Sequence, residues 1–154
     1  MEMADIKDLL VRMGALDETS DAGSIDSFAL LQDPIVSNRL AVELLQRIDR
    51  DAKPELVVAP EGYGSYFGYS IALAAWTRFL PLTAGQDGSY SLPEGLSCKR
   101  NERVIVVLDE FDKDCAQVLV SMLSEQGAKP VAVLSLLGSS EDAIEGCPCF
   151  SLLA

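Results

Sequence analysis

Hydrophobic and polar positions along the chain alternate between strand-like runs and helix-like spacing. Short apolar runs bounded by polar residues, Pro or Gly predict buried strands, and they cover residues 56–59, 80–83, 104–108, 130–137 and 149–153. Apolar residues that recur every three to four positions predict amphipathic helices, and these cover residues 6–13, 35–48, 65–79 and 115–126. Residues 139–145 are a further candidate for a short helix.

Turn and capping residues divide these elements. Gly14 is suited to end the first helix, and Asp33 before Pro34 is suited to cap the second. Residues 17–27 are rich in Asp, Ser and Gly and predict a loop, while residues 84–101 predict an irregular loop or a small hairpin.

Strands that alternate with helices indicate an α/β fold. We expect a single doubly wound domain over residues 1–154, with a mainly parallel sheet and helices on both faces. Residues 1–51 are expected to form an N-terminal helical segment packed on this domain.

The strongest candidate site follows the central apolar run, residues 104–108. Asp109 and Glu110 end this run, and ligands of open α/β sheets bind outside the carboxyl ends of the strands. The next turn opens a helix, whose free backbone N–H groups could bind an anion. Asp112 and Asp114 extend the pair to four acids, which could hold a divalent cation; Asp114 could instead be the N-cap of the helix.

The chain is strongly acidic. Its 24 acidic and 12 basic residues give a formal net charge of −12, and it contains no histidine. Such a surface repels nucleic acid and anionic membranes, so we expect neither as a partner. The first ten residues are acidic and amphipathic, unlike a signal peptide, and no apolar stretch reaches the roughly 18 residues of a membrane span. We therefore expect a cytoplasmic protein.

Two other residue groups suggest chemistry. Four cysteines could form a zinc site only if distant thiolates converged, so small buried side chains are the expected role of Cys98, Cys115, Cys147 and Cys149. The position of Cys115 at a helix N-terminus beside Lys113 favours a lowered thiol pKa, which the nearby acids oppose.

An aromatic group could stack on a base, although core or subunit packing is the expected role; it comprises Tyr63, Tyr66, Phe67, Tyr69 and Trp76. Tyr63 is the best candidate in it for a ligand contact.

Five segments in order resemble the type I phosphoribosyltransferases, and among them the orotate phosphoribosyltransferases. They are LLVRMGAL, SDAGSIDSFALLQDPIVSNRLAVELL, VVAPEGYGSYFGYSIALA, VIVVLDEFDKDCAQ and GCPCFSLLA, and they span nearly the whole chain. The resemblance implies transfer of ribose 5-phosphate from phosphoribosyl pyrophosphate (PRPP) to a nucleobase with Mg²⁺, by a homodimer. A nucleobase or nucleotide is then the expected ligand.

The resemblance also implies roles for individual residues. Asp109 and Glu110 match the acid pair that faces the ribose hydroxyls, and they are also the expected Mg²⁺ ligands. The loop around the 5′-phosphate corresponds to Asp112, Lys113, Asp114, Cys115, Ala116 and Gln117. The pyrophosphate loop corresponds to Glu61, Gly62, Tyr63 and Gly64.

The sequence departs from this family at the anion sites. No Gly, Ser or Thr occurs in residues 109–117, and Asp112 and Asp114 add negative charge where a phosphate dianion would bind. A like-charge pair at about 4 Å costs roughly 4 kcal/mol at an effective dielectric constant near 20. Residues 83–96 contain no base, whereas the family has cations there for the pyrophosphate.

These departures predict an orotate phosphoribosyltransferase-like protein with weakened or lost catalysis. Two alternatives stay open. One is a non-catalytic homologue that binds a nucleoside-like ligand or a protein partner. The other is a receiver-like or flavodoxin-like domain whose acids hold Mg²⁺.

Overall fold

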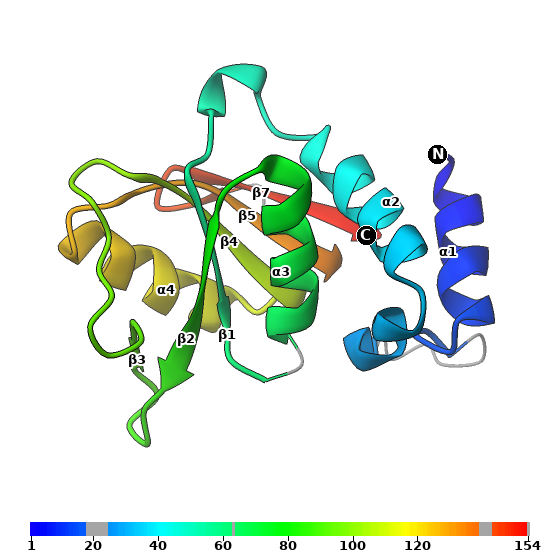
Figure 1. The fold of residues 1–154 in the computed structure, drawn as a ribbon, viewed down its shortest axis with the longest axis horizontal. Helices are drawn as coiled ribbons and strands as arrows, with labels where there is room; N and C mark the ends of the chain where they lie inside the picture. The colour runs from blue at the N-terminus through cyan, green and yellow to red at the C-terminus, as the bar shows by residue number, and fades with distance from the viewer. Residues whose placement is uncertain (18–24, 63, 139–142, 154) are drawn as a thin grey trace.

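A sheet of seven strands is the centre of the fold in the described part of the chain (Figure 1). The structure is a computed structural model that describes residues 1–17, 25–62, 64–138 and 143–153. The strands are β1 (Leu56–Pro60), β2 (Arg78–Ala84), β3 (Tyr90–Ser91), β4 (Arg103–Glu110), β5 (Lys129–Leu137), β6 (Ala143–Ile144) and β7 (Cys147–Leu153).

The strand order is β3-β2-β1-β4-β5-β7-β6. The inner strands β2, β1, β4, β5 and β7 run parallel, and the short edge strands β3 and β6 are antiparallel to their neighbours. Strand β1 pairs with both β2 and β4; Val58 lies beside Leu80 on one side and Val106 on the other. The carboxyl ends of the parallel strands therefore meet at one edge of the sheet.

Helices cover both faces of this sheet, as the sequence predicts. The helical elements are α1 (Met3–Arg12), the 3-10 turn η1 (Ser27–Gln32), α2 (Pro34–Leu45), the 3-10 turn η2 (Arg50–Ala52), α3 (Gly64–Ala75) and α4 (Lys113–Glu125). Side chains of α1, η1, α2 and α3 pack on one face with Val57 and Ala59, while α4 packs on the other with Leu56 and Val58. The mainly parallel α/β fold is thus confirmed. No described helix is long and apolar enough to cross a bilayer.

The predicted caps of the N-terminal helices are confirmed. The Asp33 carboxylate accepts hydrogen bonds from the backbone N–H groups of Ile35 and Val36, and Pro34 opens α2. Gly14 adopts a φ of 79° just after α1, a conformation that glycine adopts without steric cost.

Two predicted helices are wrong in part. The helix expected over residues 65–79 ends at Ala75, because Trp76 turns the backbone to a φ of 61° and Arg78 and Phe79 pair with β1 as part of β2. The sheet pairing therefore overrides the helical spacing.

The short helix expected over 139–145 is wrong at Ala143 and Ile144, which form β6 against β7; residues 139–142 lie outside the described part.

The segment over 84–101 contains β3, which pairs antiparallel with β2. The small hairpin, rather than a wholly irregular loop, is thus the correct alternative there.

Candidate functional site

The predicted acid pair and the predicted pyrophosphate loop lie at the same edge of the sheet. Asp109 and Glu110 are the last residues of β4, and Glu61 and Gly62 directly follow β1, its parallel neighbour. The structure therefore places these residues at the edge where α/β proteins bind ligands.

A segment from the N-terminal part of the chain contacts both acids. The Ser27 hydroxyl donates a hydrogen bond of 2.7 Å to Asp109 Oδ2, and the backbone N–H of Ile25 donates one of 2.9 Å to Glu110 Oε1. Ile25 also forms a bridge with Leu16. Ile25 and Ser27 thus use acceptor atoms that the resemblance assigns to a ribose.

Asp109 lies in an unfavourable environment for a charged carboxylate. Burial raises its pKa above the ordinary value; the hydrogen bond from Ser27 acts in the opposite direction, while the charges of Glu110 and Asp26 raise the pKa further. Its Oδ1 atom is shut off from solvent and has no hydrogen-bond partner among the described residues. A proton or a donor that reached Oδ1 would therefore stabilise the site.

The expected phosphate loop is instead the first turn of α4. Only Phe111 and Asp112 separate β4 from this helix. The Asp112 carboxylate accepts a hydrogen bond of 3.0 Å from the N–H of Cys115, and the Asp112 carbonyl accepts one of 2.9 Å from the N–H of Ala116. Those two amides are therefore already used within the chain.

The N-cap of α4 is Asp112 and not Asp114, which corrects the alternative considered for Asp114. Asp114 lies in the first turn, where a carboxylate interacts favourably with the helix dipole. Helix α4 also begins at Lys113, two residues before the predicted start, and runs on through Gln117.

The pKa of the Cys115 thiol lies above its ordinary value. Burial raises its pKa most; a hydrogen bond to Tyr90 has the opposite effect, and the charge of Asp112 raises the pKa further. Its sulfur lies 3.6 Å from the Tyr90 hydroxyl. Burial likewise raises the pKa of Cys147, to about 12.

Within the described ranges, no three acidic or cysteine residues converge into a group that could hold a metal ion, so the four-acid cluster is not formed there.

The predicted pyrophosphate loop is short. The N–H of Glu61 donates to the Leu82 carbonyl at 2.8 Å, and Gly62 has a φ of 106°, which favours glycine. The Gly62 carbonyl accepts from the Ser65 hydroxyl at 2.7 Å. Tyr63 lies outside the described residues, and Gly64 begins α3.

Arginines near this sheet belong to its opposite edge. Arg78 begins β2 and pairs with Glu102 at 2.9 Å, and Arg103 begins β4 and pairs with Glu55 at 3.4 Å. Both arginines thus stand at the amino ends of parallel strands, away from the acid pair.

Ser27 and Ile25 were missed as site residues by reasoning from sequence. Both fall in a stretch that reads as loop, and their partners lie more than 80 residues further on, at separations of 82 and 85 positions. One local signal is present: the Asp26 carboxylate caps η1 by accepting from the N–H of Phe28, which fixes the turn that carries Ser27.

The aromatic group divides between core and surface. Phe67 is buried, whereas Tyr69 and Trp76 are mostly exposed. Tyr66 packs edge-to-face on Phe28 of η1, with ring centroids 5.7 Å apart.

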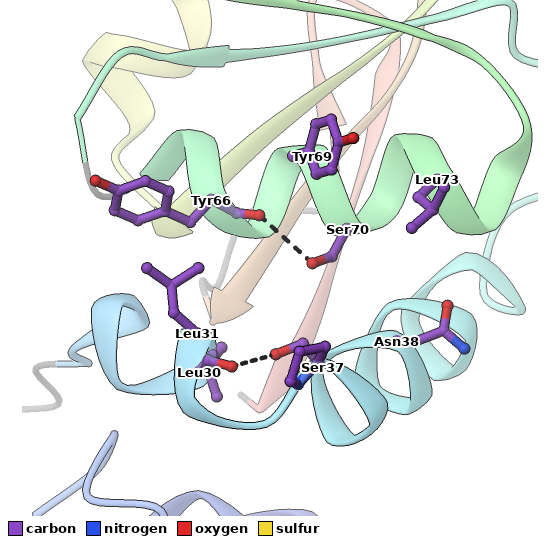
Figure 2. Close-up of a pocket in the computed structure, with 9 residues that line it drawn as sticks. Leu30, Leu31, Ser37, Asn38, Tyr66, Tyr69, Ser70 and Leu73 are labelled. Atoms are coloured by element: carbon purple, nitrogen blue, oxygen red, sulfur yellow. Dashed lines mark hydrogen bonds between the residues drawn. The ribbon is translucent and has the colours of Figure 1, made fainter.

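An apolar groove of about 240 Å³ runs between α3 and the η1–α2 segment (Figure 2). It is not part of the acid-pair site.

Solved structures with the same architecture are enzymes that transfer phosphoribosyl groups. Orotate phosphoribosyltransferase from Aeropyrum pernix superposes with a TM-score of 0.71 at 20% identity, over 96% of this chain and 92% of that one. Adenine phosphoribosyltransferase from Saccharomyces cerevisiae, solved with an imino-altritol bisphosphate and adenine, gives 0.67 at 17% identity, over 97% and 99%. The adenine enzyme from Thermoanaerobacter pseudethanolicus gives 0.68 at 17% identity, over 99% of both chains.

The chain has the type I phosphoribosyltransferase fold. This finding confirms the resemblance seen in the order of the sequence segments. No model of a known protein family matches the sequence, and no curated protein is significantly similar to it. The phosphoribosyltransferase fold is therefore established from three-dimensional similarity.

Proposed function

We propose that the protein is an orotate phosphoribosyltransferase-like member of nucleotide metabolism whose transferase activity is weakened or lost. The observation that carries this proposal is the contact of Ser27 and Ile25 with the acid pair. A ribose diol needs acceptor oxygens at this place, and one oxygen of each acid already accepts a hydrogen bond within the chain.

Access to the remaining acceptor of Asp109 is also limited. Its Oδ1 has no contact with solvent, so a ribose hydroxyl reaches it only if the residues around it rearrange. Displacement of the segment with Ile25 and Ser27 would cost its two hydrogen bonds to the acids, each about 1.5–3 kcal/mol when the acceptor is charged. Ribose binding is thus opposed before any phosphate is considered.

The start of α4 opposes binding of the 5′-phosphate. Close binding of a dianion needs free backbone N–H groups and hydroxyl donors. Here the amides of Cys115 and Ala116 donate to Asp112, and Asp112 and Asp114 add two carboxylates at the start of the helix. A phosphate oxygen about 4 Å from one of them would be repelled by roughly 4 kcal/mol at an effective dielectric constant near 20. The helix dipole offsets about 1 kcal/mol or less.

Pyrophosphate release would need positive charge. A Mg²⁺ ion held by Asp109 and Glu110 would supply Lewis-acid neutralisation of the leaving group, and these two carboxylates with water are a suitable donor set. The contacts of Ile25 and Ser27 again compete for those carboxylates. Arg78 and Arg103 are paired at the other edge and offer no compensation.

A nucleoside-like ligand without phosphates is the second candidate, and one observation favours it. Asp109 Oδ1 has no partner among the described residues, so it can accept a sugar hydroxyl once the residues around it rearrange, whereas the anion sites beside it are weak. In that case the protein binds the sugar and base of a nucleoside and transfers nothing.

Turnover assays test the proposal. We would incubate the purified protein with PRPP and Mg²⁺ and either orotate or adenine, and measure nucleotide formation, with the variant Asp109→Asn as the matched control. We expect no nucleotide above the level of the variant. Formation of orotidylate or adenylate that the Asp109→Asn substitution abolishes would overturn the loss of activity.

A thermal-shift titration with uncharged nucleosides distinguishes the second candidate. Stabilisation by a nucleoside that the Asp109→Asn variant does not show would support a binding protein. No shift at millimolar nucleoside would reject this candidate.

A further inference from the structure

Basic residues gather at the edge of the sheet opposite the acid pair. Strands β2, β1, β4 and β5 are parallel neighbours, so their amino ends meet at this edge. Six basic residues begin these strands or closely precede them; they are Lys53, Arg78, Lys99, Arg100, Arg103 and Lys129. We call these six residues the basic edge. It holds half of the 12 basic residues of the chain.

The charge of this region is opposite in sign to that of the rest of the molecule. Residues 49–55, 78, 99–103 and 129 contain seven bases and four acids, which gives a formal net charge of +3. The remaining residues carry −15 and bring the whole chain to −12. The basic edge is therefore a positive region on a strongly acidic protein, and such a region attracts acidic partners.

Internal ion pairs use only two of the six bases. Arg78 pairs with Glu102, and Arg103 pairs with Glu55. The other four bases are exposed and form no ion pair with any residue that the structure describes; they are Lys53, Lys99, Arg100 and Lys129. Their charges are therefore available to a partner.

Hydrogen bonds hold the turns of the basic edge in place. The Nε of Arg103 donates to the Lys53 carbonyl at 2.6 Å, and the N–H of Asn101 donates to the Gly127 carbonyl at 2.7 Å. Lys53 has a φ of 43°, a left-handed conformation that is unfavourable for lysine and that its contact with Arg103 helps to maintain. A surface that is fixed before binding loses less conformational freedom when a partner arrives.

The dimensions of the basic edge fit a short extended segment. Neighbouring strands lie about 4.8 Å apart, so the four strand starts span roughly 14 Å. An extended peptide rises about 3.3 Å per residue, so about four or five residues cover this distance. Beyond β5, Glu145 in the turn before β7 marks the return of negative charge.

The charge outside the basic edge distinguishes between acidic partners. A nucleic acid duplex or a long single strand extends beyond a region of roughly 14 Å, and would meet the surface that carries the remaining formal charge of −15. A short run of Asp and Glu residues can end where the positive region ends. An acidic segment of another protein therefore fits this edge best.

We propose that the basic edge binds a short acidic segment of a partner protein, whose carboxylates contact Lys99, Arg100 and Lys129. This edge lies at the other end of the parallel strands from Asp109 and Glu110. Binding there is therefore independent of what the acid pair accepts.

Fluorescence polarisation of a labelled peptide of about eight glutamates, long enough to cover the row of strand starts, tests the proposal. We expect saturable binding at about 25 mM NaCl that weakens at least about tenfold at about 200 mM, because salt screens exposed charges. The double substitution Lys99→Gln and Arg100→Gln should weaken binding at the lower salt by about tenfold or more. Both side chains are exposed, so the substitutions should not impair folding.

The matched control is the double substitution Lys7→Gln and Arg12→Gln, which changes the net charge equally but lies on α1, apart from the basic edge (Figure 1). It should change peptide affinity by less than about twofold, because distant exposed charges are screened. Absence of saturable binding, or an equal loss in both double variants, would overturn the proposal. Tighter binding of an oligothymidine of the same length than of the peptide would identify a nucleic acid site instead, and would also overturn it.

Discussion

At the scale of single residues, Asp109 is the most informative position. Its carboxylate is at the end of a buried strand, accepts one hydrogen bond from Ser27, and has one oxygen without a partner among the described residues. The sequence predicts the position of Asp109, because the apolar run before it is a clear strand. It does not predict Ser27 as a partner, because a contact over 82 positions leaves no local pattern.

The raised pKa of Asp109 predicts a specific pH dependence of stability. Between its ordinary value of 3.8 and the raised value, the folded chain binds more protons than the unfolded chain, so the free energy of unfolding falls as pH rises through that window. The substitution Asp109→Asn removes this titration. Urea denaturation at several pH values should show the variant gaining stability relative to the wild type from pH 3.8 upwards; a constant difference would contradict the assignment.

Ser27→Ala should destabilise the fold by about 1.5 kcal/mol, because it removes a hydrogen bond to a charged, half-buried acceptor. Ser70→Ala is a suitable control, since its hydroxyl lies at 3.5 Å from the Tyr66 carbonyl on an exposed helix surface, and it should change the free energy of unfolding by less than about 0.5 kcal/mol. Urea denaturation at neutral pH measures both. Equal effects of the two substitutions would show that the Ser27 contact contributes little.

At the scale of elements, the start of α4 lies where the family resemblance implies a phosphate loop. The connection from β4 is two residues, and Asp112 caps the helix with its side chain. The sequence predicts that a helix starts here, with Asp114 as its candidate N-cap. The structure corrects this to Asp112, because the helix begins at Lys113, earlier than the sequence pattern predicts.

Asp112→Ala should destabilise the fold by about 1 kcal/mol, because the N–H of Cys115 loses its acceptor. Asp114→Ala should cost no more than about 0.5 kcal/mol, since it removes only a favourable interaction with the helix dipole. Chemical denaturation of both variants tests this order. A larger loss for Asp114→Ala would identify that residue as the cap.

At the opposite edge of the sheet, an ion pair between elements joins a buried carboxylate to a partly exposed arginine. Glu102 is 3% exposed and accepts from Arg78 of β2 at 2.9 Å and from the N–H of Lys99 at 2.9 Å. Arg78→Met leaves this buried carboxylate without its countercharge and should cost about 3 kcal/mol.

Arg103→Met is the matched control for that substitution. The Arg103–Glu55 pair is at least 38% exposed on both sides, so its loss should cost about 1 kcal/mol or less. Thermal or urea denaturation of the two variants measures the difference. Similar losses of unfolding free energy in the two variants would indicate that the ion pair of the buried Glu102 contributes no more to stability than the exposed Arg103–Glu55 pair.

At the scale of the whole molecule, the parallel sheet and its two helical layers could be predicted from sequence, while several boundaries could not. Helical spacing continues through Arg78 and Phe79, yet pairing with β1 makes them strand. The contacts of Ile25 and Ser27 with the acid pair arise only when the N-terminal segment packs on the finished sheet. The fold can thus be predicted from periodic patterns of apolar residues. Which hydrogen bonds the acid pair accepts depends on residues that are far apart in the sequence.

Our central proposal is that the chain keeps the phosphoribosyltransferase fold, while contacts of Ile25 and Ser27 occupy the acid pair where a sugar phosphate would bind. Calorimetric titration of the wild-type protein with PRPP in the presence of Mg²⁺ tests it most directly. We predict no binding heat up to millimolar PRPP. Saturable binding at micromolar PRPP, lost in the Asp109→Asn variant, would contradict the claim.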